Sequence, residues 1–171
     1  MAFLYLRDDS HKIEEYMRKM LIVIALFVST GCASHQGATS SNRGLGDTRT
    51  KPLEFFDENS YLLVNYSEDP TYGFEESNPV KVGGSSENSG PINERRFLNA
   101  LLGPNGEEIT YFRAGSCCPF KTPNGLFDNT GLLDLYKVSW SGAKDTLDIY
   151  VNMYDEGDLL VPVGLKAKKK N

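Results

Sequence analysis

A short apolar run, followed by three small residues and a cysteine, separates an N-terminal export segment from the part of this chain that is expected to fold. The two cations Arg18 and Lys19 precede the uninterrupted apolar residues 20–28, and the small residues 29–31 lead directly to Cys32. This order of charge, apolar run and small residues is typical of a bacterial export signal that is removed on secretion. Because the cysteine follows at once, we expect cleavage immediately before Cys32 and attachment of a diacylglycerol to its thiol.

A membrane-spanning helix is the alternative for residues 20–28. Nine residues at about 1.5 Å each give a helix of about 14 Å, which is half of a hydrocarbon core of about 30 Å. The run is therefore too short to span, although Ser29 stands three residues before the cysteine, where leucine is usual. Residues 1–16 are charged and carry no signal features, so we expect translation to begin at Met17 and residues 17–31 to be the signal peptide.

The residues that follow Cys32 predict which membrane holds the anchor and how far from it the folded domain lies. Bacterial lipoproteins that stay in the inner membrane commonly carry an aspartate after the lipidated cysteine, whereas this chain has Ala33. We therefore expect an outer-membrane anchor, with the folded domain facing the periplasm. Residues 32–52 are the lipidated cysteine and a tether rich in Ser, Gly and Thr, whose coil would span roughly 25 Å.

The 140 residues from Cys32 onward are enough for one domain, which we expect at residues 53–165. Residues 51–165 hold 8 basic and 18 acidic side chains, a net charge of −10. Such a surface repels phosphate backbones, so nucleic acid is not an expected partner. The basic tail 166–171 is expected to be a solvated end.

Alternating apolar residues predict several strands. Residues 145–154 place Leu147, Ile149, Val151 and Met153 on one face, and residues 132–140 precede them at hairpin distance. Further strands are expected at the segments 60–66, 72–82, 109–113 and 159–163, the last at an edge because it contains a proline.

One helix is predicted at residues 91–102. Pro91 suits its first turn, an apolar stripe recurs at i and i+4, and Gly103 with Pro104 ends it. The stripe consists of Phe97, Leu98, Leu101 and Leu102. The fold class is therefore α+β and rich in strands, a mostly antiparallel sheet with one helix packed on a face.

Histidine is absent from the expected domain, because the two histidines are His11 and His35. A Ser-His-Asp triad, a Cys-His pair and a His-ligated zinc site are thereby excluded from it. The acidic pairs at 75–76, 107–108 and 155–156 are expected to be solvated, and residues 155–158 form a turn without the spaced ligands of a calcium loop. We predict no catalytic residues, no metal and no cofactor.

The candidate thiol site consists of Cys117, Cys118 and Arg113. An exported chain meets an oxidising compartment, and Cα atoms of neighbouring residues lie about 3.8 Å apart, below the ~4.4–6.8 Å of relaxed disulfides. A bond between these cysteines would be easily reduced. Three interpretations stay open: two thiols that pack or line a surface, which we expect; a vicinal disulfide; or a thiolate stabilised by Arg113 or a metal.

Five ordered blocks resemble a small family of uncharacterised bacterial lipoproteins. The most specific block is Gly-Ser-Cys-Cys-Pro-Phe. The blocks lie at residues 78–84, 93–98, 115–120, 131–134 and 150–155. Some members carry the name 2-dehydro-3-deoxyphosphooctonate aldolase. That enzyme is a TIM barrel of about 250 residues with eight strand-helix units, whereas the domain expected here is residues 53–165 with one helix. The resemblance therefore implies a location and a common fold, but it supplies no catalytic residue.

Three functions fit these patterns. The one we expect is a non-catalytic binding or interaction domain, held to the membrane through Cys32, that contacts an envelope protein or a small ligand. The first alternative is a thiol or redox protein that uses Cys117 and Cys118. The second is a lyase or hydrolase without histidine, so enzymatic activity is left open.

Overall fold

The structure is a computed structural model that describes residues 46–170. The predicted export signal, Cys32 and Ala33 lie outside the described residues. Within the described part, no helix combines the length and the apolar character that crossing a bilayer requires.

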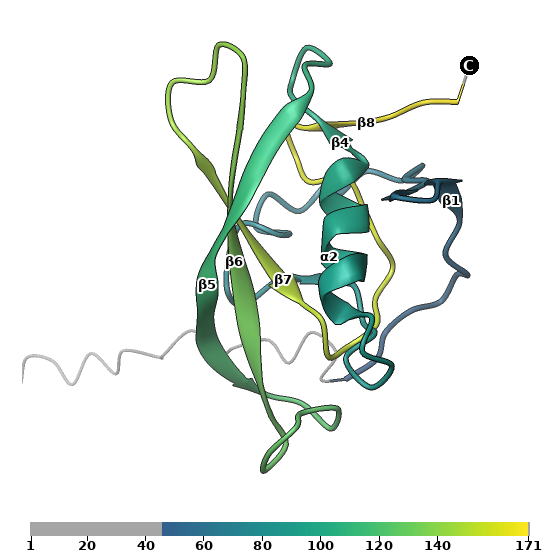
Figure 1. Ribbon diagram of the computed structural model, residues 1–171, viewed down its shortest axis with the longest axis vertical. Coiled ribbons are helices and arrows are strands. Elements are labelled where there is room, and N and C mark those ends of the chain that lie inside the picture. The colour runs from purple at the N-terminus through teal and green to yellow at the C-terminus, as the bar shows by residue number, and fades with distance from the viewer. Residues whose placement is uncertain (1–45, 171) are drawn as a thin grey trace, which may run out of the picture. The chain divides into compact units, whose positions relative to one another are not determined.

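The described chain contains one helix and eight short or long strands (Figure 1). In chain order they are β1 (Phe55–Asp57), β2 (Ser60–Tyr61), β3 (Val80–Lys81), α2 (Gly90–Asn99), β4 (Leu101–Leu102), β5 (Ile109–Lys121), β6 (Thr130–Trp140), β7 (Leu147–Asn152) and β8 (Lys166–Ala167). This content confirms the β-rich α+β class.

The main sheet has the strand order β3-β7-β6-β5. The pairs β5–β6 and β6–β7 are antiparallel, so the hairpin predicted from the two alternating segments is confirmed. β3 runs parallel to β7, with Val80 opposite Val151. The sheet is therefore mixed and not purely antiparallel.

The core lies between this sheet and α2. Phe97 and Leu98 of the helix are fully buried, as are Ile149 and Val151 of β7, and all four belong to one apolar cluster. Leu147 and Met153 are partly buried against the same cluster. The predicted inward face of residues 147–153 is thus confirmed.

β5 is longer than predicted, because it continues from Ile109 to Lys121 past the expected end at Arg113. Two breaks in its register with β6 make this possible: Ala114 and Cys118 have no partner on β6, while their neighbours do. Such bulges accommodate one extra residue each. They let an edge strand pass through Gly115 and Pro119, which a regular central strand would tolerate poorly.

The predicted helix end and the predicted free tail are both wrong. α2 ends at Asn99, and Leu101 and Leu102 pair instead with Ala167 and Lys166 in the small sheet β4–β8. The backbone N–H of Lys168 also donates to the Ala100 carbonyl at 2.9 Å. The last residues of the chain therefore complete the fold, because they supply the ladder partners that hold Leu101 out of the helix.

Residues 46–52, which we expected to belong to the flexible tether, contact the domain. Arg49 donates from Nη1 to the Glu156 carboxylate at 2.9 Å and from Nε to the Gly157 carbonyl at 3.1 Å. The carboxylate of Asp158 accepts the backbone N–H of Thr50 at 2.9 Å. The acidic turn at 155–158, expected to be solvated, thus holds the start of the described chain.

The strands predicted at 60–66, 72–82 and 159–163 are largely irregular. Only β2 and β3 fall within the first two segments, and Val161 forms a single bridge with Tyr66. Gly73 adopts a φ of +79°, and the Asp69 carboxylate accepts the N–H of Thr71 at 2.9 Å. These turn contacts override the β-forming residues around them.

Removing apolar volume from this core should be costly. We expect Ile149→Ala and Leu101→Ala each to lower the free energy of unfolding by about 2–5 kcal/mol, because both side chains are fully buried. Urea unfolding followed by circular dichroism measures this loss. Val64→Ala is the control, since Val64 is 68% exposed; losses as small as the control's at both core sites would show that the faces are assigned incorrectly.

Candidate functional site

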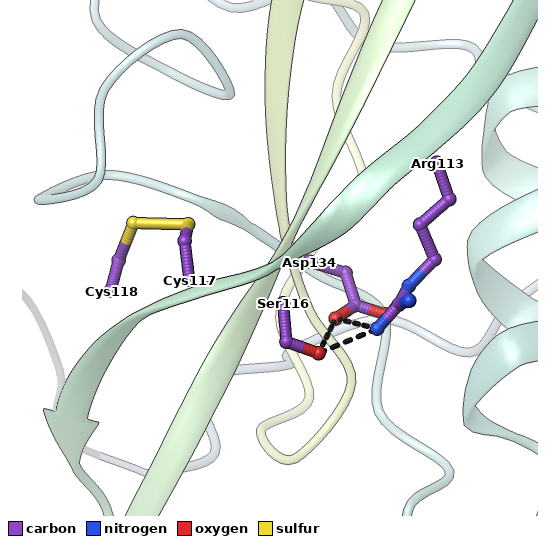
Figure 2. Close-up of a disulfide and its surroundings, with 5 residues drawn as sticks. All are labelled: Arg113, Ser116, Cys117, Cys118 and Asp134. Atoms are coloured by element: carbon purple, nitrogen blue, oxygen red, sulfur yellow. Dashed lines mark hydrogen bonds and ion pairs between the residues drawn. A yellow bond between two sulfur atoms is a disulfide. The ribbon is translucent and has the colours of Figure 1, made fainter.

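The sulfur atoms of Cys117 and Cys118 form a disulfide, with Cα atoms 3.7 Å apart (Figure 2). Adjacent side chains of a regular strand point to opposite faces. Here Cys118 is the extra residue of the second bulge and has a φ of +53°, which turns its side chain to the same side as that of Cys117. The expectation of two separate packing thiols is therefore wrong, and the vicinal disulfide is the interpretation that the structure has.

The Arg113 side chain lies on the opposite side of β5 from the two cysteine side chains (Figure 2). Its guanidinium binds Asp134 in a bidentate ion pair, with Nε 2.6 Å from Oδ2 and Nη2 2.7 Å from Oδ1. Ser116 joins this pair, since its hydroxyl donates to Asp134 at 2.9 Å and lies 2.5 Å from the Arg113 guanidinium. Figure 2 shows this cluster on one side of the β5 ribbon and the disulfide on the other. Arg113, which we grouped with the candidate thiol site, is therefore not placed to stabilise a thiolate there.

The first bulge of β5 explains this arrangement. Residues three apart on a regular strand face opposite sides of the sheet. Because Ala114 is an extra residue, Arg113 and Ser116 come to the same side, opposite Tyr136 and Asp134 of β6. Asp134 is only 2% exposed, and a buried carboxylate requires charged or hydrogen-bonding partners. The bulge delivers two of them at once.

Glu94 of α2 extends this polar network into the core. It is fully buried, its Oε2 accepts the hydroxyl of Tyr136 at 2.8 Å, and its Oε1 has no hydrogen-bond partner among the described residues. Burial raises the pKa of Glu94 to about 7, with a further increase from the Asp134 carboxylate and an opposing effect of the Tyr136 hydrogen bond. The side chain can therefore hold a proton near neutral pH.

Sequence reasoning missed Glu94 and Asp134. Asp134 gave no signal, because it stands in an alternating strand between apolar neighbours. Glu94 did give one: it lies three and four residues before Phe97 and Leu98, which is the spacing of one helix face. The buried stripe of the helix thus begins with a carboxyl group.

This buried network has the residue types of acid-base chemistry but no access for a substrate. Glu94 is fully enclosed, its partner Tyr136 donates to it, and the nearby Arg113 and Asp134 side chains bind each other. No group of three or more His, Cys, Asp or Glu side chains converges as a metal site in residues 46–170. The network therefore joins helix to sheet and gives no support to a hydrolase or lyase.

Cavities lie elsewhere on the domain. One of about 210 Å³ is lined by residues 51–54, 61–65 and 158–159, beside the docked N-terminal segment. Another of about 430 Å³ lies at the connection between β5 and β6 and is lined by Lys121, Thr122, Pro123, Asp128 and Asn129. The disulfide lines neither of them, so it belongs to the surface of the sheet.

Comparison with known protein families, with curated proteins and with solved structures finds no match to this chain. The resemblance to bacterial lipoproteins stays a prediction from the residues that carry it. The function must therefore be argued from the export pattern and from the described surface.

The buried carboxyl group makes stability depend on pH. The pKa of Glu94 is about 7 in the folded protein and ordinarily 4.5, so the folded state binds the proton more tightly. Its contribution is fully present below pH 4.5 and is lost as the pH rises toward 7. We expect the wild-type protein to lose about 2 kcal/mol of unfolding free energy from this group between pH 5 and pH 8.

Urea unfolding at both pH values, with Glu94→Gln and Glu87→Gln as variants, isolates this effect. Gln at position 94 keeps an acceptor for Tyr136 but has no proton to lose, so its stability should change less between pH 5 and pH 8. Glu87 is exposed, and its variant should follow the wild type. Equal slopes for all three proteins would contradict the role given to Glu94.

Proposed function

We propose that this protein is an outer-membrane-anchored lipoprotein whose folded domain is a non-catalytic binding or interaction domain facing the periplasm. The pattern of residues 17–32 and the alanine at position 33 support the anchor. The disulfide supports export, because such bonds persist in oxidising compartments and are rare in the cytosol.

The observation that carries a binding function is the surface around the disulfide. The register of the sheet puts Phe112, Cys117, Leu135 and Tyr150 on the face opposite the core, which we call the outer face. Phe112 is 60% exposed, and the other three are half-buried. An apolar surface carried by paired strands is pre-organised, which lowers the entropy cost of binding, and the disulfide makes the Cys117–Cys118 dipeptide rigid as well.

The charges at this position favour binding over catalysis. The two cations that flank the cysteines in sequence are both paired, Lys121 with Asp128 and Arg113 with Asp134 on the core side of the sheet. The outer face instead combines Phe112, the disulfide and the ion pair of Lys137 with Asp148, whose Nζ and Oδ1 atoms lie 2.6 Å apart. An apolar patch next to a neutralised pair suits an envelope protein or a small ligand of mixed polarity.

Photo-crosslinking in intact cells tests the anchor and the outer face together. A photoreactive residue at position 112 should give a crosslinked envelope species, and one at position 64, which is similarly exposed, should not. The mature protein should fractionate with the outer membrane. In a Cys32→Ser background the chain should remain an uncleaved precursor without acyl groups and lose the crosslink.

Two results would contradict this proposal. Processing of the Cys32→Ser variant to the same mass as the wild type would remove the lipoprotein signal. Equal crosslinking from positions 112 and 64 would remove the outer face as the binding surface.

A thiol or redox function is the second candidate, because the vicinal disulfide itself favours it. Its Cα separation of 3.7 Å is below the range of relaxed disulfides, so the bond should be easily reduced. A redox function would use it by attack of a partner thiolate on one sulfur, which releases the other as a thiolate and forms a mixed disulfide. A second thiolate of the partner would then attack that mixed disulfide, so that the partner gains the disulfide and this chain keeps two thiols.

Alkylation followed by mass spectrometry tests the disulfide, and the Cys117→Ser/Cys118→Ser variant separates the two functions. We expect the untreated protein to be two hydrogens lighter than its dithiol form and not to be alkylated at Cys117 or Cys118. Mild thiol treatment should then allow complete alkylation, because the bond is easily reduced. The double variant should keep the crosslink from position 112 under a binding function and lose it under a redox function, and two free thiols before any treatment would contradict the disulfide.

A further inference from the structure

The loop between β5 and β6 carries the most exposed large apolar side chain among the described residues. Phe127 is 83% exposed and its neighbour Leu126 is 64% exposed. The loop projects from the end of the two long strands (Figure 1). Two adjacent apolar side chains at such an apex are costly in water, and they call for a partner.

The loop cannot turn these side chains inward, because its backbone is closed by hydrogen bonds. The N–H of Thr122 donates to the Asn129 carbonyl at 2.9 Å, and that of Thr130 donates to the Phe127 carbonyl at 2.9 Å. Lys121 Nζ binds the carbonyl and the carboxylate of Asp128 at 2.9 and 3.0 Å. The apex is therefore presented in a fixed conformation.

The described chain enters the domain beside this same loop. Asn124 donates from its side chain to the carboxylate of Asp47 at 2.8 Å, and Lys81 Nζ donates to the Gly46 carbonyl at 2.9 Å. A Cβ on Gly46 would lie 3.4 Å from the ring of Pro123. Gly46, the first described residue, therefore lies next to the loop.

The length of that connection limits how far the loop lies from the anchor. Thirteen residues, 33–45, separate Cys32 from Gly46. The tether predicted from their composition would span roughly 20 Å. A lipid on Cys32 would thus hold the β5–β6 loop within reach of the membrane surface. β8 lies at the opposite end of the domain from this loop (Figure 1).

The charges at the apex suit a membrane interface. Lys121 and Asp128 form an ion pair at 3.0 Å, so the loop carries no net charge, although residues 51–165 as a whole carry −10. The acidic body keeps the rest of the domain away from anionic headgroups. Phe and Leu side chains bury in the boundary between headgroups and acyl chains.

We propose that Leu126 and Phe127 insert into the interfacial region of the bilayer to which Cys32 is anchored. The inference rests on the proposed lipid anchor. The loop then acts as a second attachment point, which fixes the orientation of the domain and keeps its outer face from lying against the bilayer.

Fluorescence quenching in proteoliposomes tests the insertion. The full chain, purified with its lipid, is reconstituted into phosphatidylcholine vesicles that contain bromine on the acyl chains. In a Trp140→Phe background, Phe127→Trp places the single tryptophan at the apex, and Phe112→Trp places it on the outer face as a control of high exposure. We expect several-fold stronger quenching at position 127 than at position 112.

The intact mass of the same preparation separates the two failures. Acylated protein with equally weak quenching at both positions would overturn the insertion and leave the anchor standing. A blue-shifted but unquenched tryptophan at position 127 would show that protein covers the apex, which also overturns the insertion. Protein that carries no acyl mass on Cys32 would overturn the anchor and, with it, the inference.

Discussion

The two bulges of β5 decide what each face of the main sheet carries. If Ala114 were paired as in a regular strand, Arg113 and Ser116 would face opposite sides, and the buried Asp134 would lose one of them. If Cys118 were paired as in a regular strand, the two cysteines would point to opposite faces, as neighbours in a strand do. One strand thus supplies an ion pair to the core side and a disulfide to the outer side, because its register shifts twice.

The buried carboxyl groups tie the single helix to this strand pair. Glu94 enters from α2, receives the Tyr136 hydroxyl, and lies near the Arg113–Asp134 pair that β5 and β6 form. A buried polar group costs free energy unless it is hydrogen-bonded. The helix can therefore satisfy Glu94 in only a narrow range of positions on the sheet, which apolar contacts alone would not impose.

The two ends of the described chain close the domain in different ways. At its start, Arg49 and Thr50 bind the acidic stretch 155–158, whose carboxylates would otherwise repel one another. At its end, β8 pairs with β4 and fixes the residues after the helix. The first of these contacts brings the start of the described chain to the end of the domain where the β5–β6 loop projects, since Asp47 accepts a hydrogen bond from Asn124 of that loop.

The sequence by itself determined the features that depend on local period and composition. The alternation of Leu147, Ile149, Val151 and Met153, the hairpin that leads to them and the Phe97–Leu98 stripe follow from side-chain direction, which is a local property. The sequence also determined that chemistry based on histidine is excluded from residues 46–170.

Only the tertiary structure decided the rest, because each remaining feature depends on a partner distant in the chain. Local periodicity predicts that Leu101 ends a helix and that Lys166 belongs to a free tail. Both predictions fail because these two segments pair with each other as β4 and β8. Arg113 stands close to the cysteines in sequence, yet a bulge and a carboxylate 21 residues away turn it to the other face of the sheet. The periodicity of apolar residues indicates which face of a sheet a side chain occupies in a regular strand. It does not indicate where the register shifts, and the shifts in β5 decide which side chains meet at this site.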